Sequence, residues 1–140
     1  MLLASNGMKV LSVDPGYGRC GMAVLEKKGG KEALLYSVCV ETSPKAPFPE
    51  RLLQVADECV RLLIEYAPDA VAMEKLHFGT NQKTGLQVAE VRGALIAEAA
   101  RAEVPLFEYM PGEVKSAVSG FGGANKTQMT KMLHLLLSIK

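Results

Sequence analysis

The sequence predicts a mixed α/β fold: a five-stranded sheet in which three antiparallel strands are followed by two parallel ones, with helices packed against it. The first observation is a set of three apolar runs between residues 9 and 42, joined by short glycine-containing turns as in an antiparallel meander. The second is that each later strand-like run follows a helical segment, and such a crossover places the new strand parallel to an earlier one. The chain has 140 residues, 49% of them hydrophobic, so one domain can bury a substantial core.

The antiparallel part begins with a short strand that ends at a carboxylate. In residues 9–14, a period of two places Val10, Ser12 and Asp14 on one face, and Pro15-Gly16 prevents further pairing. The second strand is expected over 20–25, a hairpin turn over 27–31, and the third strand over 34–42.

The rest of the chain alternates helices with strands. Three prolines in residues 43–49 predict a loop, and Pro49 suits the first turn of a helix that ends at Ala67-Pro68. The segments expected after it are a strand at 70–74, a helix at about 82–102, a strand at 104–109, a short helix opened by Pro111, and a last helix for which Asn125 and Gln128 form a capping box.

Two of these strands end in an acidic residue. Glu74 shares a face with Ala70 and Ala72, and Asp14 ends the first strand in the same way. Ligands of such sheets gather at the carboxyl ends of parallel strands, so we expect both acids at one site. Oxygen ligands with small neighbours suit Mg²⁺, whereas the sequence offers no zinc set. Each acid alone is weak evidence, since Asp-Pro-Gly is a common turn and a glutamate that ends a strand usually points into water.

Charge and cysteine usage narrow the class of protein. The net charge is +1, so any contact with nucleic acid must come from local basic groups. The three cysteines, Cys20, Cys39 and Cys59, form no CxxC pair, which indicates a reduced, cytoplasmic protein rather than a disulfide scaffold. Residues 1–7 lack the features of a signal peptide or membrane span, so no membrane association is expected. They are interpreted as an upstream extension or a cloning remnant, with the domain over residues 8–140.

Motifs spread over residues 8–140 resemble those of the RuvC family of Holliday junction resolvases, which has the ribonuclease H-like fold. The resemblance rests on VDPG with Asp14, AMEK with Glu74, the segment from His77 through Asn81 into Leu86, Arg92-Gly93, VPLFEY, VK at Lys115, and the glycine loop that leads to Lys126. It implies a nuclease that hydrolyses paired phosphodiesters at a four-way DNA junction in recombination and repair. By this resemblance, Asp14 and Glu74 would be catalytic ligands of Mg²⁺, which Mn²⁺ could replace, and Lys115 and Lys126 would face DNA phosphates.

The loop after Glu74 supplies further DNA-binding candidates. They are His77, Phe78, Asn81 and Lys83, in a segment that mixes aromatic and basic groups. The family commonly has an aromatic wedge where this chain has His77, and Phe78 lies next to it, so either ring could stack on an unpaired base. The alternative is that Phe78 packs over the edge of the sheet.

Partners are expected from the long helix and from the resemblance. The helix that begins near Gln82 is apolar nearly all round, so it would be covered by its own domain or by a second subunit. The resemblance favours a homodimer and also implies a branch-migration complex as partner. A charged residue at Leu95 is expected to split the homodimer.

The family pattern is incomplete at the carboxyl end. Its other two acidic ligands come from a helix beyond the position of Lys140, so we interpret the chain as a fragment or a natural truncated relative with the final helix missing. The main hypothesis is a Mg²⁺-dependent junction endonuclease, and the alternative is a non-catalytic junction-binding dimer of the same fold. A third hypothesis is a nucleotide-binding domain built on a related DxG turn. It would need further glycine-rich phosphate loops and a second lobe, and the sequence shows neither.

Overall fold

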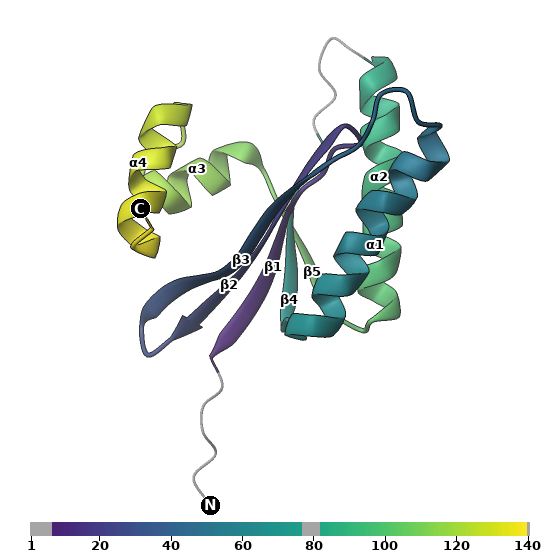
Figure 1. Cartoon of the computed structure of the whole chain (residues 1–140). Coiled ribbons are helices and arrows are strands. Elements are labelled where there is room, and N and C mark those ends of the chain that lie inside the picture. Colours follow the sequence, from purple (N-terminus) through teal and green to yellow (C-terminus); the bar gives the residue numbers. More distant parts are fainter. Residues whose placement is uncertain (1–6, 77–81, 140) are drawn as a thin grey trace, which may run out of the picture.

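The computed structural model describes residues 7–76 and 82–139, and it confirms the predicted five-stranded mixed sheet with flanking helices (Figure 1). The strands are β1 (Met8–Asp14), β2 (Arg19–Lys28), β3 (Lys31–Glu41), β4 (Ala70–Glu74) and β5 (Leu106–Tyr109). Their spatial order is β3-β2-β1-β4-β5. The first three form the predicted antiparallel meander, and β4 and β5 extend the sheet from β1 as parallel strands.

The helices begin and end at residues that the sequence marks. They are α1 (Phe48–Tyr66), α2 (Gln82–Arg101), α3 (Pro111–Ser119) and α4 (Lys126–Leu137). Pro49 lies in the first turn of α1, and Ala67 ends that helix in the left-handed conformation, with its N–H donating to the Leu63 carbonyl at 3.2 Å. The capping box of α4 is confirmed: Asn125 and Gln128 exchange hydrogen bonds between side chain and backbone N–H, both at 2.9 Å.

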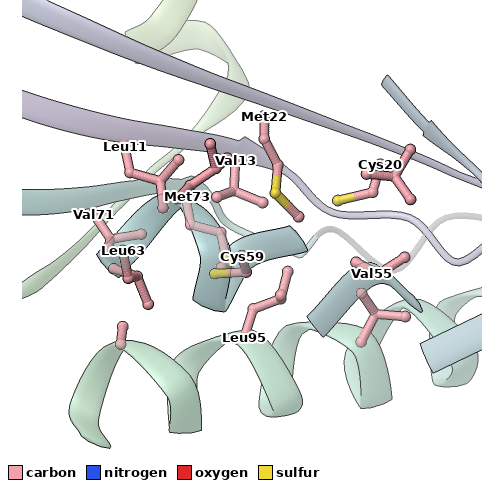
Figure 2. Close-up of a cluster of buried hydrophobic side chains, with 14 of the residues drawn as sticks. Leu11, Val13, Cys20, Met22, Val55, Cys59, Leu63, Val71, Met73 and Leu95 are labelled. Carbon is pink, nitrogen blue, oxygen red and sulfur yellow. The ribbon is translucent and has the colours of Figure 1, made fainter. Parts of the chain in front are cut away.

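The hydrophobic core lies between one face of the sheet and the pair α1 and α2 (Figure 2). Its fully buried members include Leu11, Val24, Val71 and Met73 from the sheet, Val55 and Cys59 from α1, and Val91 and Leu95 from α2. Burial of a large apolar side chain stabilises the fold by about 1.5–3 kcal/mol, so this layer holds the sheet and the two helices together. Helices α3 and α4 lie on the other side of the sheet (Figure 1).

The long helix α2 has two different apolar surfaces. We predicted that Leu95 lies in a subunit interface, and this is wrong: its side chain is 1% exposed and packs in the core. The opposite surface carries Leu86, which is 61% exposed, and Gly93, where an added Cβ would meet no atom within 4 Å. A charge at Leu95 would therefore disrupt the core of one subunit. Leu86 is the residue at which an interface through α2 can be tested.

Several element boundaries differ from the sequence prediction. Strand β2 continues to Lys28 instead of residue 25, and β3 runs from Lys31 to Glu41 instead of over 34–42, so the hairpin turn is shorter than expected. Strand β5 begins at Leu106 instead of residue 104, and Val104 packs against the core ahead of the strand. Helix α1 begins one residue earlier than Pro49. Among the helices of residues 7–76 and 82–139, none combines the length and hydropathy needed to cross a membrane. The interpretation of residues 1–7 stays a prediction, since residues 1–6 lie outside the described part of the chain.

Candidate active site

Strands β1 and β4 place Asp14 and Glu74 side by side. The parallel register pairs Val13 with Met73, so the next residue of each strand is one of the two acids. Adjacent strands lie about 4.8 Å apart, and alternation points both acids away from the face on which Val13 and Met73 are buried. Asp14 is exposed and Glu74 is half-buried. Both line one open cleft of about 200 Å³.

Small residues surround this acid pair on the sheet. Gly21 of β2 stands opposite Asp14, and a Cβ added there would lie 3.6 Å from the Asp14 Cβ, which is ordinary van der Waals contact. One step back along the strands, Ser12 pairs with Ala72 on the same face. The sheet therefore leaves room above the carboxylates for an ion and its ligands.

The turn after Asp14 is tied to the start of α1. Gly16 has a strict requirement for glycine, because a Cβ there would lie 2.1 Å from the carbonyl oxygen of Arg19. The Thr42 hydroxyl donates to the Tyr17 carbonyl oxygen, and Arg51 Nε donates to Thr42 Oγ1 at 2.8 Å. The Arg51 guanidinium also lies 4.9 Å from the centroid of the Tyr17 ring. These contacts, which the sequence interpretation missed, hold the loop that follows the catalytic candidate.

A buried arginine of α2 completes the wall of the acid cleft. The Arg92 side chain is 9% exposed, and its guanidinium donates to the main-chain carbonyl oxygen of Glu74 and to Glu108 Oε1 of β5. Burial of a charge is costly unless it is paired and hydrogen-bonded, and here both conditions are met. The sequence interpretation assigned Arg92 no role. One sequence signal could have indicated this role: Arg92 is a charged residue on the face of α2 that otherwise carries core residues such as Val91 and Leu95.

Helices α3 and α4 bring two lysines to the same acid. A second cleft of about 320 Å³ is lined by Glu74, Lys115 and Lys126, together with Asn125 and other residues of α3 and α4. Lys126 is the first residue of α4 and is exposed, whereas Lys115 is half-buried. Glu74 thus belongs to both clefts, and it links the carboxylate pair to the lysine pair.

The loop candidates are only partly described. His77, Phe78 and Asn81 lie outside the described residues, and their assignment to DNA binding stays a prediction. Lys83 is exposed in the first turn of α2. Its assignment also stays a prediction.

The donor set of the acid cleft fits a hard divalent cation. Mg²⁺ is commonly held by one or two carboxylates and completes its octahedral shell with water and phosphate oxygens. Asp14 and Glu74 supply such a pair. Within residues 7–76 and 82–139, the side chains of His, Cys, Asp and Glu form no group of three or more that could hold a metal. The described residues therefore suit one ion shared with a phosphate better than a closed, all-protein site.

Comparison with known proteins gives the family. The model of the family described as crossover junction endodeoxyribonuclease RuvC matches residues 10–140. The crossover junction endodeoxyribonuclease RuvC of Petrotoga mobilis is 44% identical over 134 residues, which cover 95% of this chain and 82% of that protein. The one of Thermosipho melanesiensis is 39% identical over 132 residues, covering 94% of this chain and 84% of the relative.

Solved structures agree in fold over nearly the whole chain. Thermus thermophilus RuvC in complex with a Holliday junction substrate is 33% identical, with a TM-score of 0.89 over 95% of this chain and 81% of that one. The yeast mitochondrial Holliday junction resolvase Ydc2 is 17% identical, with a TM-score of 0.67 over 90% of this chain and 60% of that one, and shows the fold alone. The predicted resemblance is thereby confirmed, and the chain belongs to the RuvC family of crossover junction endodeoxyribonucleases.

Proposed function

We propose that this chain is a structure-selective endonuclease unit that binds four-way DNA junctions and takes part in their Mg²⁺-dependent hydrolysis during homologous recombination and DNA repair. The observation that carries the proposal is the position of Glu74, which lines one cleft with Asp14 and a second with Lys115 and Lys126. A site for a cation and a site for phosphates thus share one residue. The solved Thermus thermophilus relative, which holds a Holliday junction, supports the same substrate.

Asp14 and Glu74 are the residues that would hold the cation. When bound, Mg²⁺ would supply polarisation of the phosphodiester and activation of a water molecule. Asp14 is exposed at the end of β1, so a phosphate of the substrate can approach the same ion from solvent. Mn²⁺ accepts similar oxygen ligands and is the expected substitute.

Lys115 and Lys126 would bind the DNA backbone next to that ion. Lys126 is poorly placed by itself, because the positive end of the helix dipole disfavours a cation in the first turn by under about 1 kcal/mol. A phosphate at the amino end of α4 would reverse that effect, since it attracts both the lysine and the free N–H groups. The position of Lys126 therefore supports phosphate binding at this end of α4. Lys83, in the first turn of α2, is a further candidate contact.

A homodimer through α2 is the second part of the proposal. The exposed surface of α2 includes Leu86, Gly93 and Ile96, spaced so that they follow one side of the helix. A second copy would cover this apolar surface, and a dimer would present two acid clefts to a junction. Docking of a branch-migration complex is carried over from the family resemblance alone.

The alternative function is a non-catalytic junction-binding dimer. It is favoured by one observation, that the described residues bring two carboxylates together and no larger group of metal-ligating side chains. Two carboxylates are expected to hold divalent ions weakly and to position only one of the two ions that this chemistry commonly uses.

The test uses a synthetic four-way junction, a duplex of the same sequence, and Mg²⁺. We expect the 140-residue chain to bind the junction more tightly than the duplex and to leave it uncut. A version extended with the carboxyl-terminal segment of the Petrotoga mobilis relative is expected to cut, and Glu74→Gln in that version should abolish cutting without loss of binding. Cutting by the 140-residue chain would show that the catalytic ligands lie elsewhere. Binding without cutting by the extended version would favour the non-catalytic alternative.

A further inference from the structure

Arg92 holds the main chain of a proposed metal ligand. The last hydrogen bond of the parallel ladder between β4 and β5 runs from the Lys75 N–H to the Tyr109 carbonyl oxygen at 2.8 Å. The peptide that precedes Lys75 is that of Glu74, and its carbonyl oxygen accepts from the Arg92 guanidinium. Glu74 is therefore fixed at the end of β4 by the sheet on one side and by α2 on the other. A strand end would otherwise be free to fray.

The same arginine carries a charge into the acid cleft. Arg92 lines the cleft together with Asp14 and Glu74, and its side chain is nearly buried. A free guanidinium in this position could form a bidentate pair with either carboxylate and compete with a cation for it. An arginine beside a cation site therefore weakens cation binding unless another acidic group compensates its charge.

Glu108 binds that charge from the other face of the sheet. It pairs in register with Met73, whose side chain is buried in the core, so Glu108 also projects toward α2 and away from the Asp14 face. Its carboxylate accepts from Arg92. The pair is close to neutral as a unit, and it leaves the charges of Asp14 and Glu74 available to an ion.

We propose that Arg92 and Glu108 are positioning residues of the metal site: Arg92 fixes the Glu74 main chain, and Glu108 keeps the arginine charge off the Asp14 and Glu74 carboxylates. This inference rests on the proposed function, in which these two acids bind a divalent cation. The proposed role of Arg92 and Glu108 differs from that of a purely structural ion pair in one respect. The residue at position 108 controls the affinity of the site for a cation, because it sets whether the charge of Arg92 is compensated.

The test is a Mg²⁺ titration of the 140-residue chain, followed by the amide NMR signals of Gly21 and Lys75, which adjoin Asp14 and Glu74. This measurement follows millimolar affinities and needs no cleavage. Glu108→Gln should weaken Mg²⁺ binding roughly tenfold, which is the order of effect of one uncompensated positive charge beside a divalent ion at a water-like dielectric constant. Adding Arg92→Gln should restore part of the affinity, because glutamine removes the uncompensated charge although it is too short to replace the bond from Arg92 Nη1 to the Glu74 carbonyl oxygen.

Three controls separate the possible explanations. Helix α2 also carries a second pair, in which the exposed Arg101 lies 3.5 Å (N···O) from the half-buried Glu98. Replacing both by glutamine makes the same change in charge as the Glu108 and Arg92 double variant and should leave the titration unchanged. Hydrogen exchange of the Lys75 amide reports the fixation of β4 independently of metal. Arg92→Lys keeps the charge but loses the planar fork, so it should speed that exchange and weaken Mg²⁺ binding even if Glu108→Gln folds poorly.

Failure of this inference differs from failure of the proposed function. If Glu108→Gln and Arg92→Lys leave Mg²⁺ affinity unchanged, or if the double variant fails to recover it, Arg92 and Glu108 are merely structural. If Glu74→Gln leaves the Mg²⁺-induced shifts of Gly21 and Lys75 intact, the cation does not bind at the acid cleft, and the proposed function fails with it.

Discussion

The salt dependence of junction binding should fall when Lys115 and Lys126 are both replaced by alanine. Each lysine that neutralises a DNA phosphate releases counterions, which contributes about 0.9 to the slope of log affinity against log salt concentration. Both lysines line the cleft that they share with Glu74, and in the proposed function each contacts one phosphate. The double variant should therefore lose about 1.8 from that slope.

The assay is fluorescence anisotropy of a labelled four-way junction in EDTA, where no hydrolysis can occur. Between about 50 and about 200 mM salt, a slope difference of about 1.8 makes the unmodified chain lose about twelvefold more affinity than the variant. The two curves should thus converge as salt rises. The melting temperature of the variant should stay near that of the unmodified chain, because Lys115 and Lys126 make no salt bridge among the described residues.

The matched control removes the same two charges at the far end of the sheet. Lys28 and Lys31 are exposed at the β2–β3 hairpin, and the register places that hairpin beside Met8, at the end of β1 opposite Asp14. Replacing both by alanine changes the net charge equally but should leave the slope nearly unchanged. Equal slopes for the two double variants would refute the assignment of Lys115 and Lys126 to the DNA interface.

The further predictions concern assembly and stability. Leu86→Glu should convert the proposed homodimer to monomers in sedimentation at micromolar concentration. Leu95→Ala should instead lower the free energy of urea unfolding by about 2–5 kcal/mol, because it opens a cavity in the core. Asn125→Ala should cost about 1 kcal/mol by removing the cap of α4, measured by the same unfolding. Burial raises the pKa of Cys20 to about 11 and of Cys59 to about 12, from an ordinary value of 9.0. The thiols of the unfolded chain therefore ionise at lower pH than those of the folded chain. The stabilisation from the buried neutral thiols is complete below pH 9 and is lost progressively as the pH rises from 9 through about 11 to 12. At pH 10 the loss should be about 1 kcal/mol for each thiol, and alanine at either position should flatten the decline between pH 8 and pH 10.

Local features of the sequence were sufficient for the elements and for the acid positions. The meander followed from apolar runs and turn residues, the end of β1 from Pro15, and the start of α4 from Asn125 and Gln128. Each depends on residues within a few positions of one another, where backbone sterics and capping hydrogen bonds act. The position of Asp14 at the end of its strand was predictable for the same reason.

Contacts between distant parts of the chain set which of these features lie together. Helix α2 is apolar around most of its circumference, so periodicity alone could not tell that Leu95 packs in the core while Leu86 stays exposed. Likewise, no local signal places Lys115 and Lys126 at a cleft with Glu74, or aims Arg92 at the carbonyl of that residue. These contacts join residues far apart in the chain, and they form only when the parallel pairing of β4 with β1 and β5 sets the register. The order of residues thus sets which groups the chain offers for chemistry. The packing of α2, α3 and α4 around the end of β4 sets which of them lie together, because such contacts depend on non-local burial and pairing.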